Sequence, residues 1–534
     1  MRPNVKTNLP SARDALNASS GPGWRIGGHS LPVPSLARLK ASVCVIYGDD
    51  NQLQFVMLCL MLLLYGPLLW ISSKFTPVDS LDFTFNSMLH HLLHGQFYVD
   101  PEIVRNEGIL RDGHVYVYWG IWCALLRLPL WVVDRLYMDV TVWSCLVAVC
   151  LAGLTKVRAV LLLRRQCANT LAANSAICLM LTYILLGGSQ IGYLRISVYQ
   201  EVVFWAYAFA EVFVYFAVKG LVNRNFDLST LNAMAVCAGL ALLTRVSTGV
   251  GLLLAIALLM VVLIAQFVAA ESVGRKTVVW RLTHALIQPR VLVPVGILVV
   301  FVAAAGTVNY FRWGNPLSFA HFGLAVFKSP QPIGVQDVGV EGVGVEGGTF
   351  GLSRVPFGLL YYFLPVWVLH GRDGLLVFAQ THTRWYKYVE TPPGSILLTD
   401  LFPLCFVLLL AVHLWKRRIR YSPAALYAAV LTAGLFLPCL LILNFPSLAY
   451  RYRMEFYPLI DLLAFLGLYF TLADEVTLTT FRRRQGWLTV ALAVSILSAF
   501  VALTLYDFSL SIGRPHELYD RAIRDVYRVV HLLI

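Results

Sequence analysis

Residues 249–268 read GVGLLLAIALLMVVLIAQFV, a run without a single charged side chain. A helix of this length crosses a hydrocarbon core of about 30 Å. Because every backbone polar group in lipid must be paired internally, such a run predicts a helix. Similar runs recur, and we expect spans at 52–72, 139–157, 171–189, 199–218, 229–244, 249–268, 291–311, 395–415, 423–444, 456–474 and 487–508. The predicted fold class is all-α, a polytopic membrane protein with about 11 transmembrane helices.

The composition agrees with a membrane protein and argues against a soluble one. Of the 534 residues 58% are hydrophobic and 13% charged, whereas soluble domains carry roughly 25% charged residues. The formal net charge of +13 suits either nucleic-acid binding or the positive-inside rule. We favour the second and predict no nucleic-acid partner, because the basic residues sit in short loops between apolar runs.

The placement of those basic residues predicts the orientation. With the N-terminus in the cytoplasm, five consecutive cytoplasmic connections carry Lys156, Arg158, Arg164, Arg165, Lys219, Arg224, Arg275, Lys276, Arg281, Arg290, Lys416, Arg417, Arg418, Arg420, Arg482, Arg483 and Arg484. The short loops on the other face hold only Arg195, Arg245, Arg451 and Arg453. This alternation predicts a cytoplasmic N-terminus and an external C-terminus, in the inner membrane if the source is bacterial.

The chain divides into three predicted regions. Residues 1–51 are expected to form a disordered cytoplasmic tail, residues 52–508 the transmembrane domain, and residues 509–534 an external C-terminal helix. Two external loops are long, 73–138 and 310–394, and both are expected to carry interfacial helices. The Gly- and Val-rich stretch 334–351 is interpreted as a mobile surface loop or, less favoured, a lid.

Two carboxylates just after the first span are the first candidates for chemistry. Asp79 and Asp82 lie three apart, on one face if the segment is helical. A carboxylate at the membrane surface can serve as a general base or bind a divalent cation. Asp79 is equally suited to capping the helix that follows, so Asp82 is the favoured functional residue.

Histidines and aromatic residues fill the rest of the first long loop. His90 and His94 have the i, i+4 spacing of metal ligands, but an interfacial helix ending at Gly95 is the stronger interpretation. Asp112–Gly113 predicts a turn. The nearby aromatic residues, Tyr116 among them, suit either a headgroup belt or sugar binding.

Ionisable residues also gather at the external ends of later spans. Tyr199 and Glu201 open the fourth span, and an ionisable group at that depth is a site candidate. Arg245, Arg451 and Arg453 lie on the same predicted face, and arginine binds phosphate through its planar fork. Each arginine is equally consistent with a headgroup contact or a local ion pair.

Taken together, these motifs resemble those of bacterial GT-C-type glycosyltransferases that use a polyprenyl-phosphate sugar. The matching pieces extend from about Pro77 to Pro458 and are Asp82 with the helix to His94-Gly95; Asp112 to Tyr116 leading to Leu128-Pro129; Tyr199-Gln200-Glu201; Leu243-Thr244-Arg245; Asn309 to Leu317 with Arg312; and Arg451-Tyr452-Arg453 with Tyr457-Pro458. Two positions depart from the family. The frequent Asp-Glu pair is Asp82-Phe83, and Gln200 stands before Glu201 where His is common.

The resemblance implies an inverting transfer of a sugar from the lipid carrier to an acceptor hydroxyl at the external face. The acceptor would be a glycan, lipid or protein of the cell envelope. Asp82 matches the catalytic base, with Asp79 second, and Arg245, Arg451 and Arg453 match donor-phosphate ligands. Glu201, Tyr116, Tyr199 and Arg312 complete the expected substrate site. No cofactor is certain, and a divalent cation on Asp79 and Asp82 stays open.

Two other classes of function remain. A transporter or flippase of a lipid-linked saccharide would place charges near span centres, where Glu211, His413 and Asp461 are the clearest and show no obvious pairing. An O-antigen polymerase or ligase would use external arginines and the loop 310–394.

Overall fold

The computed structural model describes residues 25–26, 29–30, 49–75, 80–166, 170–270, 277–318, 350–365, 386, 388–390, 392–416, 423–473 and 475–511. The chain forms two compact units, Met1–Leu60 and Met61–Ile534. In the first, β1 (Arg25–Ile26) pairs antiparallel with β2 (His29–Ser30), and α3 (Asp50–Phe75) begins. Most of the predicted tail, the stretch 319–349 and the predicted C-terminal helix from 512 onward lie outside the described residues.

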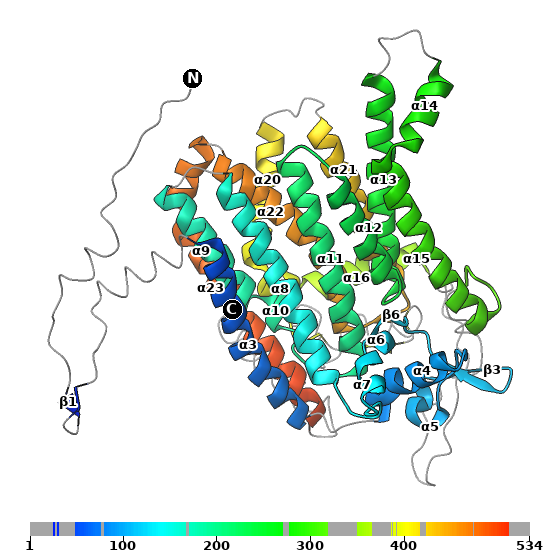
Figure 1. The fold of residues 1–534 in the computed structure, drawn as a ribbon. Coiled ribbons are helices and arrows are strands. Elements are labelled where there is room, and N and C mark those ends of the chain that lie inside the picture. The colour runs from blue at the N-terminus through cyan, green and yellow to red at the C-terminus, as the bar shows by residue number, and fades with distance from the viewer. Residues whose placement is uncertain are drawn as a thin grey trace. The chain divides into compact units, whose positions relative to one another are not determined.

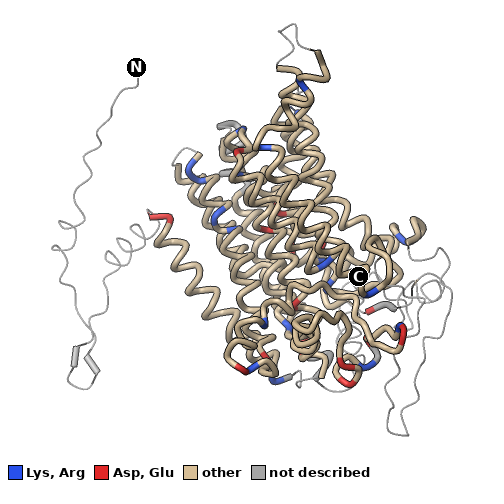
Figure 2. The backbone as a smooth tube through the Cα atoms, turned by 45° about the vertical axis from the view of Figure 1, so that its right-hand side comes forward, with Lys and Arg blue, Asp and Glu red and all other residues tan. Residues whose placement is uncertain are grey.

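A helix stands at each of the eleven predicted spans. They are α3, α8 (Thr141–Arg165), α9 (Leu171–Leu186), α11 (Val198–Val222), α12 (Leu228–Leu242), α13 (Val246–Ala270), α15 (Pro289–Trp313), α20 (Leu401–Lys416), α21 (Pro423–Asn444), α22 (Tyr457–Ala473) and α23 (Glu475–Ser511). Among the described residues, nine helical stretches are long and apolar enough to cross a bilayer, while α12 and α20 are shorter apolar helices. The prediction of an all-α polytopic membrane protein is confirmed. Figure 2 shows charged residues concentrated at the helix ends, with few along the helices.

Local sequence signals fix where these helices begin and end. Four described helices have an N-cap residue whose side-chain oxygen accepts a hydrogen bond from a backbone N–H of the first turn. These residues are Thr170 for α9, Ser197 for α11, Asp227 for α12 and Thr277 for α14 (Val278–Ile287). These residue types are the preferred caps, since they satisfy N–H groups that have no partner within the helix. At the other end, Gly314 terminates α15 with a φ of 74°, a conformation open to glycine at no steric cost.

Glycines set how closely the helices of the second unit approach. A Cβ built on Gly434 of α21 would lie 2.3 Å from the Cα of Ala255 in α13, and one on Gly251 would lie 2.3 Å from a ring carbon of Pro438. Small residues allow backbones in a membrane bundle to touch in this way. Helix α11 is buried along most of its length and packs against α8, α12 and α22 (Figure 1).

The segment between α3 and α8 forms a compact layer at one end of the second unit, which we call loop 1 (residues 80–140). It contains η1 (Ser80–Phe83), α4 (Thr84–Leu93), α5 (Pro101–Val104), η2 (Arg105–Glu107), β3 (Ile109–Arg111), β4 (His114–Tyr116), α6 (Trp122–Leu125) and α7 (Leu128–Val132). Figure 1 shows these elements at the end of the bundle opposite α14. The predicted helix ending near Gly95 and the predicted turn at Asp112–Gly113 are both present. Gly95, Asp112 and Gly113 all have a positive φ, and each follows or precedes the end of a helix or strand.

The second long loop meets the same end of the bundle. Its described parts are η4 (Leu352–Arg354), α16 (Val355–Phe363), β5 (Tyr388–Val389) and α19 (Ile396–Thr399). Strand β5 pairs in parallel with β6 (Ser447–Leu448), which precedes η5 (Tyr450–Glu455). Residues far apart in the sequence are therefore joined beside η5, the element that carries Arg451 and Arg453.

Candidate functional site

Glu201 lies in a fully buried ion pair. Both of its carboxylate oxygens accept from the guanidinium of Arg127, one N–H donating over 2.8 Å, and Ser144 Oγ donates to it over 2.5 Å. Neither charged side chain is exposed. Burial alone would lower the pKa of Arg127, but the adjacent Glu201 carboxylate raises it. The pair ties loop 1 to α11 and α8, and Arg127 is a residue that the sequence analysis missed.

Asp82 lies in η1, half-buried at the start of loop 1. Three residues later, the ring of Phe85 lies 5.4 Å from the Arg127 guanidinium and 6.0 Å from the Trp119 ring. Trp119 in turn meets Tyr199 edge-to-face at 5.5 Å. This series of contacts connects the segment of Asp82 with the first turn of α11. Asp79 lies outside the described residues.

Arg245 stands in the turn between α12 and α13 and pairs with Glu455. Its Nε–H donates to Glu455 Oε1, and Ser247 and Thr248 donate to the same carboxylate over 2.6 and 2.8 Å. The guanidinium also lies 5.1 Å from the ring of Tyr452, and the side chain is 19% exposed. Arg245 is thus partly exposed although its Nε is paired.

Arg453 is buried completely. Its guanidinium donates to Gly394 O over 3.0 Å and to Thr399 Oγ1 over 2.7 Å, and it lies 3.5 Å from Asp400 Oδ2. Tyr183 and Tyr457 donate to the same Asp400 carboxylate over 2.6 and 2.8 Å. Arg453 and Asp400 therefore hold η5 onto α19.

Arg451 is held by aromatic rings instead of by a carboxylate. Its guanidinium lies 4.4 Å from the ring of Tyr199 and 5.2 Å from that of Tyr452. The guanidinium of Arg195 lies 4.7 Å from the ring of Tyr506, and its Nε is buried without a hydrogen-bond partner among the residues that the structure describes. Within the described part of the chain, neither arginine has a carboxylate at salt-bridge distance.

We call these side chains the arginine–tyrosine cluster, which consists of Arg195, Tyr199, Arg245, Arg451, Tyr452 and Tyr506. Tyr452 has a guanidinium near its ring from both Arg245 and Arg451. Beside the cluster, Tyr118 OH lies 3.5 Å from Glu107 Oε2, and burial, followed by the Glu107 charge, raises the pKa of this phenol. Guanidinium groups stacked on aromatic rings can bind an anionic group while the rings contact an apolar part of the same ligand.

Tyr116 and Arg312 lie where loop 1 meets α15. The Tyr116 ring lies 6.0 Å from that of Trp313, and Arg312 donates to Trp119 O over 2.6 Å while being 2% exposed. Arg111 closes the contact from the other side by donating to Arg312 O over 2.7 Å. Burial raises the pKa of Tyr116. The structure gives Arg312 a contact between loop 1 and α15 and does not bring it to the arginine–tyrosine cluster by any described contact.

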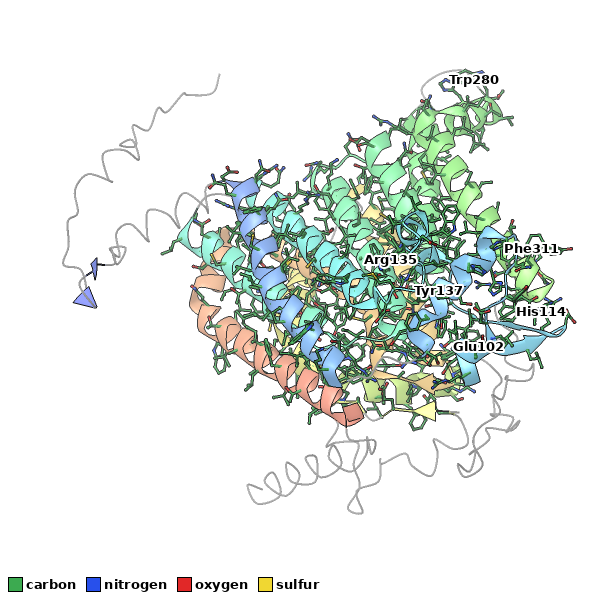
Figure 3. All side chains as sticks on the ribbon, turned by 60° about the horizontal axis from the view of Figure 1, so that its bottom comes forward. Glu102, His114, Arg135, Tyr137, Trp280 and Phe311 are labelled. Carbon is green, nitrogen blue, oxygen red and sulfur yellow. The ribbon has the colours of Figure 1, made fainter. Side chains whose placement is uncertain are left out.

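The outer edge of loop 1 carries stacked rings. Tyr98 stacks on His114 at 4.4 Å and Phe97 on Phe311 at 4.7 Å, and Figure 3 shows His114 and Phe311 at the same edge, far from Trp280 of α14. The rings of His90 and His94 lie 4.9 Å apart, but His94 Nδ1 faces the carbonyl of His90. The described residues contain no group of three or more ligand-type side chains that suits a metal ion.

Taken together, the fold defines a multi-pass α-helical membrane protein with a polar layer at one end. No protein-family model matches its sequence, and no characterised protein sequence matches it either.

Solved structures do show similarity in fold. The apo oligosaccharyltransferase of Archaeoglobus fulgidus is 13% identical, with a TM-score of 0.40, over 88% of this chain and 56% of that one. The same enzyme, AglB, with an inhibitory peptide and a dolichol-phosphate gives 13% identity, a TM-score of 0.38 and the same coverage. ArnT from Cupriavidus metallidurans, bound to undecaprenyl phosphate, gives 14% identity and a TM-score of 0.38, over 87% of this chain and 77% of that one. This chain spans little more than half the length of the oligosaccharyltransferase.

Proposed function

We propose that this protein transfers a sugar from a polyprenyl-phosphate donor to an acceptor hydroxyl at the external membrane face. The observation that carries the proposal is the arginine–tyrosine cluster. Arg195 and Arg451 reach the loop 1 end of the bundle, and neither has a carboxylate at salt-bridge distance among the described residues. A lipid phosphate supplies the missing negative charge, and arginine binds it through two parallel N–H···O bonds.

Arg451 is the first phosphate ligand in this proposal. Its half-buried guanidinium is fixed between two rings, so little side-chain freedom is lost on binding. Arg245 contributes through its terminal nitrogens. Arg453 holds η5 in place beside the site, since its terminal nitrogens donate to Gly394, Thr399 and Asp400.

The proposed reaction uses Asp82 as the base and Arg451 as the phosphate ligand. Asp82 accepts the proton of the acceptor hydroxyl as that oxygen attacks the anomeric carbon. The bond from the anomeric carbon to the phosphate oxygen breaks, and its electron pair leaves with the lipid phosphate, which Arg451 stabilises. Attack opposite the leaving group inverts the anomeric configuration. We expect the acceptor to be a cell-envelope glycan, lipid or protein.

A divalent cation would need ligands that the described residues do not assemble. Of the two predicted ligands only Asp82 is described, and one carboxylate does not form such a site. No step is therefore assigned to a cation. Turnover with and without a chelator measures the dependence directly.

The test is sugar release from a panel of polyprenyl-phosphate sugars by the full chain in detergent. Asp82→Asn is expected to lower kcat by about 10²–10⁴-fold, the contribution of a general base, while Asp112→Asn in the exposed loop 1 turn leaves it unchanged. Loss in Asp79→Asn alone would move the base to Asp79. Arg451→Gln is expected to weaken donor binding by about 10- to 150-fold, since a hydrogen bond to a charged group contributes about 1.5–3 kcal/mol.

The control for Arg451→Gln is Arg135→Gln, an exposed arginine of loop 1. No sugar release by the wild type from any donor, in membranes that supply native acceptors, would contradict the proposal. That outcome would favour the transporter or the polymerase and ligase alternatives.

A further inference from the structure

Three buried ionisable side chains meet inside the helix bundle, away from the arginine–tyrosine cluster. They are Lys156 of α8, Glu211 of α11 and Asp461 of α22, each at most 3% exposed. The three helices pack against one another. Glu211 lies near the middle of α11, about 20 Å from its start at 1.5 Å per residue. Ionisable groups at this depth are costly and mark function by default.

The lysine is already paired. Lys156 Nζ lies 2.9 Å from Asp461 Oδ2 and donates to Ser189 Oγ over 2.8 Å. Tyr207 donates to the same Asp461 oxygen over 3.3 Å, and the ammonium lies 5.0 Å from the Tyr207 ring. Lys156 and Asp461 thus form an ion pair of zero net charge, and both members also make hydrogen bonds, to Ser189 and from Tyr207.

Glu211 is the third member and has no cation of its own. Both of its oxygens are buried without a hydrogen-bond partner among the described residues. Its ionisable neighbours are Asp461, Lys156 and Tyr207. Among the other elements packed against α11, the helices α6, α12, α13 and α21 contain no charged residue. The remaining one, η5, carries Arg451, Arg453 and Glu455, whose contacts are with the partners described above. With all three groups ionised, the cluster would hold one uncompensated negative charge in a low-dielectric interior.

That charge would be too costly to keep. An effective desolvation penalty of several kcal/mol per buried ion is recovered only when a partner compensates it, and Asp461 already uses the lysine. A carboxylate next to another carboxylate resolves the repulsion by binding a proton. We propose that Lys156, Asp461 and Glu211 form a buried proton-binding site in which Glu211 holds the proton as a neutral carboxylic acid.

The site is independent of the proposed sugar transfer, but it adjoins the supports of that region. A Cβ on Gly188 of α10 (Gly188–Ile191) would lie 2.8 Å from Asp400 Oδ1, and Ser189 next to it receives the Lys156 hydrogen bond. The proton site and the Arg453–Asp400 pair therefore both adjoin the short helix α10, at Ser189 and Gly188.

Infrared difference spectroscopy on the full chain in liposomes tests the proposal at neutral pH. With carbon-13-labelled glutamate, the wild type is expected to show the C=O stretch of one neutral glutamic acid that Glu211→Gln removes. If Glu211→Gln removes carboxylate bands instead, the side chain is ionised and the proposal is wrong.

A second variant makes the test specific to the three-residue cluster. Asp461→Asn frees Lys156 to pair with Glu211, so the neutral-acid band is expected to disappear although Glu211 is still present. Tyr207→Phe, which removes one hydrogen bond and no charge, is expected to retain the band. Persistence of the neutral acid in Asp461→Asn would show that Lys156 does not control the proton and would overturn the site as described.

A hydrophobic carbodiimide gives a chemical readout, because it adds to protonated carboxylic acids. In the wild type we expect Glu211 to be modified, as located by mass spectrometry. In Asp461→Asn the modified fraction of Glu211 is expected to fall at least about tenfold, the change that 1.4 kcal/mol produces. Glu455, paired with Arg245, is the internal control and is expected to stay unmodified. Addition of Na⁺ distinguishes a proton from a small cation, since Na⁺ protects Glu211 only if the cation occupies the site and displaces the proton.

Discussion

At the scale of single residues, the Arg127–Glu201 pair shows what a buried charge does in this protein. Removing one partner leaves the other ionised and buried without compensation, which costs about 3–5 kcal/mol. We expect Glu201→Ala to lower the unfolding midpoint of the purified protein markedly, measured by thermal unfolding in detergent. Glu102→Ala, an exposed glutamate of loop 1, is expected to have no effect.

The double variant Arg127→Met/Glu201→Met tests whether the ion pair stabilises in itself. Replacing both partners by apolar side chains is often neutral, so we expect most of the lost stability to return. A double variant as unstable as Glu201→Ala would mean that the hydrogen bonds from Ser144 and to Cys123 O carry the stability.

The sequence predicted which residues gather at the loop 1 end but not which of them are paired. Arg245, Arg451 and Arg453 have the same residue type and the same predicted sidedness. The structure separates them through partners such as Glu455 and Asp400, which lie 210 and 53 residues away in the chain. Pairing at such separations depends on helix packing, which periodicity and charge placement do not encode. The roles predicted for Asp82 and the arginines remain predictions.

At the scale of elements, loop 1 contains a pH-sensitive contact. Burial alone would raise the pKa of Asp100, but hydrogen bonds from Ser87 and His91, over 2.7 and 3.0 Å, lower it. A carboxyl with a depressed folded-state pKa stabilises the fold above its unfolded pKa of about 3.9 and loses that contribution as pH falls through the folded value.

We therefore expect backbone amides of α4 and α5 to have lower protection factors against hydrogen exchange, each relative to the unfolded chain at the same pH, below about pH 4 than at neutral pH. Asp100→Asn is expected to show the lower protection factors already at neutral pH and little further change in them on acidification. Hydrogen exchange with mass spectrometry resolves loop 1 from the bundle. Equal protection of the wild type at both pH values would contradict the prediction.

Helix packing gives a second prediction at this scale. Gly434→Val places methyl groups against the Ala255 backbone, and overpacking of this kind costs about 1–3 kcal/mol. Gly296→Val in α15 is the matched control, because a Cβ there meets nothing within 4 Å. We expect a lower unfolding midpoint for Gly434→Val alone. The eleven helices were predictable because hydrophobic length is local, whereas these close approaches join residues of different helices.

At the scale of the whole molecule, the orientation in the membrane stays a prediction from charge alternation. Loop 1 contacts the start of α11 and the end of α12, whereas the α11–α12 turn lies at the opposite ends of these two helices. A cysteine in each therefore shows which side of the membrane that end faces. We expect Asp112→Cys to react with a membrane-impermeant maleimide in intact cells, and Asn225→Cys to react only after permeabilisation. The reverse pattern would place the arginine–tyrosine cluster in the cytoplasm. The wild type, which has 10 cysteines, provides the background.

Loop 1 is fastened to parts of the chain that follow it by a long distance, and this affects how the protein is made. Backbone N–H groups of Gly120 and Trp122 donate to Thr244 O and Leu243 O, and Arg312, 193 residues after Trp119, donates to the carbonyl of that residue. In the predicted orientation, loop 1 is translocated before either partner has left the ribosome. Until the seventh span is inserted, loop 1 lacks its hydrogen bond from Arg312 and is accessible to chaperones and proteases. Ribosome-bound chains that stop before Arg312 should therefore display a protease-sensitive loop 1, and chains that extend past it a protected one.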